Sequence, residues 1–290
     1  AFAGEDQDWC DPVTSIFMAA DQPAAPGVGT WTAIGNATNI LEINNPTTEI
    51  TGFGIGEYTY LWTVYNGPCE STNTTDLITI NIFDHDQPAS NVGPDLEFCT
   101  PQTTAQMNAT APVFPATGYW SIIGSSIGQI QNITSPNTDI TNLVPGIQYF
   151  SWTISNGPCV PSLTSDTIAI HVFDSSLPDA FAGDNDSLCA PFDLSAICTT
   201  LNGSLLSGAA TGEWTQVSGP TTAIFDNTTT SVTGICDLIV GTYTFAWTVN
   251  NGPCGTTSDT VLVVVNDPNI TQPSAGPDAF YCTPTSTHIM

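Results

Sequence analysis

The stretch Trp62-Thr63-Val64-Tyr65-Asn66-Gly67-Pro68-Cys69 occurs three times in the chain in closely similar form. Its second and third copies cover residues 152–159 and 247–254. Aromatic and β-branched residues recur at every second position before each Asn-Gly-Pro, which is typical of a strand with one buried face. Glycine permits positive φ and proline cannot continue a strand ladder, so each strand is predicted to end there. Three copies predict three equivalent structural units.

Other motifs keep the same order around this stretch. Each unit begins with a glycine and a cysteine six residues later, and a Gly-x-Trp follows at 29–31, 118–120 and 212–214. Each ends with an alternating apolar run between two aspartates, at 76–84, 166–174 and 259–267. We find no amphipathic helix, so the sequence predicts an all-β fold of tandem β-sandwich domains in a linear array.

The repeat pattern also predicts the domain boundaries. We expect repeat 1 over residues 1–87, repeat 2 over 88–177, repeat 3 over 178–270 and the start of a truncated fourth repeat over 271–290. Because the first residues match those at 180–183, the chain is expected to be a piece of a longer polypeptide.

Two tryptophans in each repeat are candidate core residues. We expect the members of each pair to face each other across the sandwich core; the six residues are Trp31, Trp62, Trp120, Trp152, Trp214 and Trp247. An alternative role in sugar binding would need aromatic residues exposed on one face. Trp9, Phe83 and Phe173 are the candidates for such a face.

The charge balance excludes several classes of partner. The chain has no Lys or Arg against 27 Asp and Glu, for a net charge of −27. Without cations it cannot neutralise nucleic-acid phosphates or dock electrostatically on anionic membranes. It has no run of 18 or more apolar residues. We therefore predict no nucleic-acid partner and no direct insertion into a membrane.

Nine cysteines recur at repeat spacing, which is typical of disulfides formed in an oxidising compartment. The simplest pairing joins the first cysteine of each repeat to the cysteine of its own Asn-Gly-Pro-Cys. The predicted pairs are Cys10–Cys69, Cys99–Cys159, Cys189–Cys254 and Cys198–Cys236, and the partner of Cys282 is missing. The predicted location is extracellular, either secreted or at a cell surface. Zinc is a weak alternative because the chain has no Cys-x-x-Cys.

Acidic residues gather in sequence at the repeat junctions. They are Asp84, Asp86, Asp95, Asp174, Asp179, Asp184, Asp186, Asp267 and Asp278. One hypothesis is that Ca²⁺ binds there, because it takes six to eight oxygen ligands and would offset the repulsion between carboxylates. The alternative is that these acids lie in water and accept hydrogen bonds within turns. Neither hypothesis requires a cofactor.

No motif predicts catalysis: the chain has no His-Glu-x-x-His, no Gly-x-Ser-x-Gly and no phosphate-binding glycine loop. Modification is a separate hypothesis. Eight Asn-x-Ser/Thr sites occur, at Asn36, Asn73, Asn108, Asn132, Asn185, Asn202, Asn227 and Asn269. Asp-Ser/Thr-aliphatic triplets place further candidate glycosylation sites at Thr167, Ser187 and Thr260.

Taken together, the glycine–aspartate starts, the Gly-x-Trp and the Asn-Gly-Pro-Cys strands resemble tandem PKD-like, Ig-like repeats. Such repeats occur in giant surface proteins of Bacteroidetes, including gliding adhesins exported by the type IX system. The resemblance covers the whole chain, with one departure at Gln148, which stands where Tyr58 and Tyr243 stand. The Asp-Ser/Thr-aliphatic triplet also resembles the O-glycosylation signal of that phylum. These modules serve mostly as spacers and stalks.

Repeats in series build length because each folds on its own and meets only its neighbours. The leading interpretation is therefore a non-catalytic, extracellular array that forms the shaft of a cell-surface adhesin or filament. Its partners would be further repeats of the same polypeptide or filament. The alternative is a glycan-binding, adhesive module or an accessory domain of a secreted hydrolase, with surface glycans as the partners.

Overall fold

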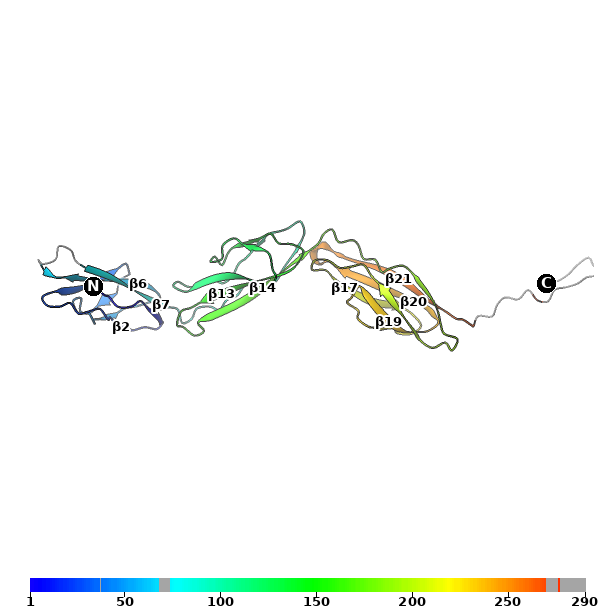
Figure 1. Ribbon diagram of the computed structural model, residues 1–290, viewed down its shortest axis with the longest axis horizontal. Helices are drawn as coiled ribbons and strands as arrows, with labels where there is room; N and C mark the ends of the chain where they lie inside the picture. Colours follow the sequence, from blue (N-terminus) through cyan, green and yellow to red (C-terminus); the bar gives the residue numbers. More distant parts are fainter. Residues whose placement is uncertain (37, 68–73, 270–275, 277–290) are drawn as a thin grey trace, which may run out of the picture. The chain divides into compact units, whose positions relative to one another are not determined.

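The computed structural model describes residues 1–36, 38–67, 74–269 and 276 (Figure 1). The described chain consists of β-strands with one short 3-10 helix, η2 (Gly252–Cys254). It forms two compact units: the first comprises residues 1–176 together with 207–210 and 251–254, and the second comprises the other residues. Cys69, Asn73, Asp278 and Cys282 lie outside the described residues.

Repeat 1 contains two sheets within the first unit. The larger has the order β1-β7-β6-β3 and the smaller the order β2-β5-β4. The strands of the larger sheet are β1 (Gln7–Cys10), β7 (Thr74–Phe83), β6 (Gly56–Tyr65) and β3 (Val28–Ile34). Those of the smaller sheet are β2 (Ser15–Phe17), β5 (Glu49–Thr51) and β4 (Asn39–Ile40). β1 runs parallel to β7, and the other neighbours are antiparallel.

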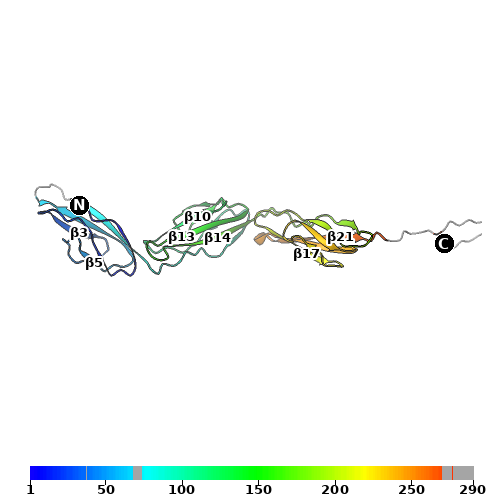
Figure 2. The same cartoon turned by 60° about the horizontal axis from the view of Figure 1, so that its bottom comes forward.

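Repeat 2, also in the first unit, has the same plan (Figure 2). Its larger sheet has the order β10-β13-β14-β8, and β8 is parallel to β14. These strands are β10 (Thr117–Ile123), β13 (Gly146–Ser155), β14 (Leu163–Phe173) and β8 (Leu96–Cys99). The smaller sheet consists of β11 (Gln129–Ile130), β12 (Asp139–Thr141) and β9 (Ala105–Gln106).

Repeat 3 supplies the sheets of the second unit, in the orders β15-β21-β20-β17 and β16-β19-β18. The larger sheet consists of β15 (Asp186–Cys189), β21 (Thr256–Asn266), β20 (Gly241–Asn250) and β17 (Thr211–Ser218). The smaller consists of β16 (Ile197–Asn202), β19 (Val232–Leu238) and β18 (Ile224–Phe225). The tandem, all-β, Ig-like or PKD-like fold predicted from the sequence is therefore confirmed. The exact domain boundaries stay a prediction.

The tryptophan pairs lie in the core of each repeat, but not across it as expected. Trp31 on β3 is the direct strand partner of Trp62 on β6, and their rings are 4.8 Å apart. The other pairs, Trp120–Trp152 and Trp214–Trp247, have ring distances of 5.3 Å and 5.1 Å. Both members belong to one sheet because the Gly-x-Trp strand is the antiparallel neighbour of the Asn-Gly-Pro-Cys strand.

The glycine of each Gly-x-Trp makes this packing possible. A side chain at Gly29 would overlap the ring of Trp62, and one at Gly118 would overlap the ring of Trp152. The ring of Trp62 or Trp152 can lie over the neighbouring strand because the glycine beneath it has no Cβ.

Candidate functional site at the joints between repeats

Strand direction determines where the cysteines that recur in each repeat lie. β8 is parallel to β14, and Cys99 is opposite Phe173, the last residue of β14. The loop that contains Cys159 connects Ser155, at the end of β13, to Leu163, at the start of β14. The two cysteines of repeat 2 therefore lie at opposite ends of an 11-residue strand. At about 3.3 Å per residue that separation is roughly 33 Å, whereas a disulfide needs Cα atoms within about 7 Å.

The disulfides accordingly join consecutive repeats. Cys10 is bonded to Cys159, with Cα atoms 5.0 Å apart, and Cys99 is bonded to Cys254, with Cα atoms 5.4 Å apart. The predicted pairs Cys10–Cys69, Cys99–Cys159 and Cys189–Cys254 are therefore wrong. Both observed bonds lie within the first compact unit.

Two further cysteines complete the described set. Cys198 is bonded to Cys236 within repeat 3, which is the pairing expected for these two residues. Cys189 is free and exposed. Cys189 lies opposite Asn266 at the end of β21, the position from which Cys10 and Cys99 reach the following repeat.

The Asn-Gly-Pro-Cys loop also makes noncovalent contacts at each of these bonds. We call the set of Cys10, Phe83, Asp84, Asn156, Gly157 and Cys159 the first joint. Asn156 is 5% exposed, and its Nδ2 donates a 2.8 Å hydrogen bond to the backbone oxygen of Asp84. Phe83, Ala116 and Cys159 form a small buried cluster against Cys10.

The second joint, Cys99, Phe173, Asp174, Asn251, Gly252 and Cys254, repeats these contacts. The Nδ2 of Asn251 donates a 2.8 Å hydrogen bond to the backbone oxygen of Asp174. Phe173 lies against Gly252 as Phe83 lies against Gly157, and a side chain on either glycine would overlap the phenyl ring. Each motif residue thus has a role: asparagine donates, glycine receives the ring and cysteine forms the bond.

The loop has the same internal shape at both joints. The backbone N–H of Cys159 donates to the oxygen of Asn156 at 3.1 Å, and that of Cys254 donates to the oxygen of Asn251 at 3.0 Å. Gly157 and Gly252 both have φ of +50°, which favours glycine. Gly67 in repeat 1 has a φ of +64°.

These contacts correct the expected sugar-binding face. Phe83 and Phe173 are only 8% and 6% exposed because the loops cover them. Trp9 is 43% exposed. No local pattern indicates this burial, although Phe83 and Phe173 each precede the terminal aspartate of a last strand.

The acids predicted to share calcium are not brought together. Asp84 lies at the end of β7, whereas the Oδ1 of Asp95 accepts a 2.8 Å hydrogen bond from the backbone N–H of Ala169, inside β14. Among the described residues, no group of three or more His, Cys, Asp or Glu is placed to hold a metal ion. The binding of calcium at the junctions stays a prediction.

Four of these acids accept hydrogen bonds from backbone N–H groups one or two residues further along the chain. The Oδ1 atoms of Asp84, Asp174, Asp186 and Asp267 accept from the backbone N–H of Asp86, Ser176, Ser187 and Asn269, respectively. Asp184 and Asp186 also line a cavity in repeat 3. No hydrogen bond to a side-chain oxygen of Asp179 is found in the described part of the chain, and Asp278 lies outside that part.

Asp174 shows the electrostatic consequence of such turns. Its carboxylate accepts hydrogen bonds from the Oγ of Ser176 at 2.6 Å, the backbone N–H of Ser176 at 2.9 Å and the Oγ of Ser207 at 3.4 Å. These bonds favour the charged form, so the pKa of Asp174 is lowered, with the side chain of Ser176 as the largest cause.

The candidate glycosylation residues Thr167, Ser187 and Thr260 are all exposed. Their modification stays a prediction. No helix in the described part of the chain has the length and apolar character needed to cross a membrane.

Comparison with known proteins agrees with the fold. Residues 191–265, within repeat 3, match the family described as "K319L-like, PKD domain". The mouse "Dyslexia-associated protein KIAA0319-like protein" is 26% identical over 221 residues, which cover 73% of this chain and 21% of the mouse protein. The human "Dyslexia-associated protein KIAA0319" is 24% identical over 242 residues, which cover 80% of this chain and 22% of the human protein.

These matches correct the resemblance drawn from the sequence. The relatives are mammalian proteins, and the family that residues 191–265 match is described as "K319L-like, PKD domain", so the assignment to type IX-secreted surface proteins of Bacteroidetes is wrong. The chain spans about a fifth of the length of these relatives.

Two solved structures are also similar. A titin fragment, "I-band fragment I67-I69", covers 91% of this chain and 97% of its own at 10% identity and a TM-score of 0.36. The "PKD domain from KIAA 1837 protein" covers 35% of this chain and 96% of its own at 29% identity and a TM-score of 0.27.

Proposed function

We propose that this chain is a non-catalytic, extracellular repeat array that acts as the shaft of a surface adhesion protein or filament. The observation that carries the proposal is the first joint, where a disulfide, a buried asparagine and a phenylalanine act together. A freely jointed chain of domains would need none of these. A shaft needs them, because transmitted force otherwise turns each domain on its linker.

The cysteine chemistry supports the proposed location. Structural disulfides persist in oxidising compartments, and the described part of the chain has three. Secretion or display at the cell surface would keep the joints oxidised. A reducing compartment would leave each joint with only its noncovalent contacts.

The proposed partner is a further repeat of the same kind. Cys189 lies where Cys10 and Cys99 bond to the next Asn-Gly-Pro-Cys loop, and it is exposed and free. We therefore propose that Cys189 bonds to such a loop on a further repeat. Asn266 replaces the phenylalanine found at the other joints, so this bond would lack the ring-on-glycine contact.

The test is a comparison of two double variants with the parent chain. C10S/C159S removes the first joint's bond, and the matched control C198S/C236S removes the bond inside repeat 3. Spin labels on exposed residues of repeats 1 and 2, such as Leu77 and Ile147, would report the distance distribution between those repeats. We expect a broader distribution only in C10S/C159S. Equal distributions in that variant and the parent would overturn the proposal.

A further inference from the structure

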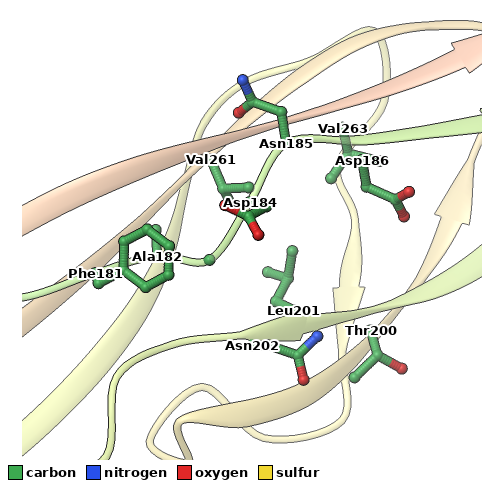
Figure 3. A pocket seen from close by; sticks show the side chains of 11 residues that line it. Phe181, Ala182, Asp184, Asn185, Asp186, Thr200, Leu201, Asn202, Val261 and Val263 are labelled. Carbon is green, nitrogen blue, oxygen red and sulfur yellow. The ribbon is translucent and has the colours of Figure 1, made fainter.

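A cavity of about 390 Å³ opens in repeat 3, within the second unit. It lies between the segment that leads into β15, at the edge of the larger sheet, and β16, at the edge of the smaller sheet (Figure 3). Leu201, Val261 and Val263 form its apolar floor, and Phe181, Asp184 and Asp186 stand at its rim. Floor and rim therefore differ sharply in chemistry.

Smaller core residues account for the apolar part of the cavity. Val261 and Val263 on β21 are the strand partners of Phe245 and Tyr243 on β20. Ile78 and Ile80 of repeat 1 pair in the same way with Tyr60 and Tyr58. Repeat 2 has Ile168 and Ile170 at these positions. Each valine lacks one methylene group, although all six side chains are at most 2% exposed.

The third floor residue differs in shape rather than in volume. Leu201 pairs with Thr233, in the way that Met18 and Met107 are hydrogen-bonded to Thr48 and Thr138. A leucine here replaces a longer, unbranched methionine of similar volume. Repeat 3 thus has a smaller side chain at the two valine positions and a shorter one at Leu201, beneath the rim.

The rim carries negative charge that the chain itself does not neutralise. Asp184 points into the cavity in Figure 3, above Leu201. No hydrogen bond to its carboxylate is found among the described residues. Asp186 is held in place, because its Oδ2 accepts a 3.1 Å hydrogen bond from the Oγ1 of Thr199. With no Lys or Arg in the sequence, the cation must come from a ligand.

We propose that this cavity binds a primary ammonium group on an aliphatic stem, and specifically a lysine side chain of a basic partner protein. The stem would lie on Leu201, Val261 and Val263, while the ammonium group meets Asp184 and the face of Phe181. Phe181 is 51% exposed and is available for that contact. The net charge of −27 would attract such a partner over a distance.

A metal ion fits this cavity less well. Calcium takes six to eight oxygen ligands, and no group of three or more His, Cys, Asp or Glu is placed to hold a metal ion in the described part of the chain. A sugar would need an aromatic platform with several hydrogen-bonding groups, whereas Phe181 is the one ring among the residues that line the cavity. The combination of carboxylate, ring and aliphatic floor selects an alkylammonium group.

The test uses the whole chain and a tetralysine peptide with blocked ends, followed by amide chemical shifts. We expect shifts at Leu201, Val261 and Val263, and at least tenfold weaker binding to D184N. D139N is the matched control, because it removes the same charge from an exposed site in repeat 2. V261I/V263I fills the floor without changing charge and should also weaken binding, by about threefold or more.

Two results would overturn the proposal. One is equal weakening by D184N and D139N, which would mean that only the overall charge attracts the peptide. The other is unchanged binding of V261I/V263I, which would mean that the stem does not enter the cavity. A peptide with acetylated lysines should not bind, and binding of that peptide would also contradict an ammonium site.

Discussion

Repeats 1 and 2 share one frame with repeat 3, but they use it differently. In the first two, the last strand ends in a phenylalanine that packs on the glycine of the next Asn-Gly-Pro-Cys loop. In repeat 3, that position is Asn266, which donates hydrogen bonds to the Oγ of Ser187 at 2.9 Å and the backbone oxygen of Leu188 at 3.0 Å. Repeat 3 also has two smaller floor residues, Val261 and Val263, and its own internal disulfide. The three repeats therefore share one arrangement of strands. Their joints and cavities differ because of substitutions at the ends and edges of those strands.

The largest expected effect concerns the part of the frame that the repeats share. Trp152 is fully buried, so Trp152→Ala should destabilise repeat 2 by about 3–5 kcal/mol through lost burial and a cavity. Trp9→Ala, at a site that is 43% exposed, should change stability by less than about 1 kcal/mol. Urea unfolding followed by fluorescence would measure both. Similar losses in the two variants would show that the paired tryptophans are not the core.

The next effect separates the internal bridge from the joints. C198S/C236S removes a bond between residues 38 apart in sequence, which should cost repeat 3 about 2–4 kcal/mol. C10S/C159S should leave the stability of each repeat's core nearly unchanged, because its bond joins different repeats. Calorimetry under non-reducing conditions distinguishes the two. A larger loss in C10S/C159S would mean that the joint contributes to folding of the repeats themselves.

A smaller effect tests the difference between the cores. V261I/V263I should stabilise repeat 3 by about 1.6 kcal/mol, because it adds two methylenes and each is worth about 0.8 kcal/mol where space exists. The converse change in repeat 1, I78V/I80V, should cost about 1–3 kcal/mol. If the isoleucines destabilised repeat 3 in chemical denaturation, the space beneath the rim would be too small to hold them.

The smallest effect concerns pH at the second joint. The pKa of Asp174 is lowered in the folded state, so its carboxylate contributes to the stability of the fold. This stabilisation is fully present above the ordinary pKa of 3.8 and is lost as the pH falls through the lower, folded-state pKa. S176A should raise the pKa of Asp174 toward 3.8 more than S207A does, because Ser176 is the larger cause. Carboxyl chemical shifts across an acid titration would measure it. An unshifted pKa in S176A would contradict the assignment.

The fold could be predicted from the sequence because its signals are local. Alternation around Trp62, the small residue in Gly-x-Trp and the stop at Asn-Gly-Pro each act over a few residues. The pairing of the tryptophans was misplaced because alternation shows which face is buried, not which strand lies next to it. The order of strands in the sheet settled that point.

The joints could not be predicted by spacing alone. A bond from Cys99 to Cys159 and one from Cys99 to Cys254 both fit a repeating pattern, and the shorter loop favoured the first. What decides is that β8 is parallel to β14, which places Cys99 at the far end from its own loop. Likewise, Asp84 and Asp95 are close in sequence, but Asp84 lies beside Asn156, in the loop before β14, whereas Asp95 lies beside Ala169, inside β14. Strand direction was the missing physical information.

Mapping of the disulfides shows directly whether Cys10 and Cys99 bond to the following repeat or to their own. Since trypsin has no site in this chain, the unreduced protein would be cut with Glu-C, Asp-N and chymotrypsin, and the linked peptides identified by mass spectrometry. We expect peptides that link Cys10 to Cys159 and Cys99 to Cys254. Peptides that link Cys10 to Cys69 and Cys99 to Cys159 would contradict it.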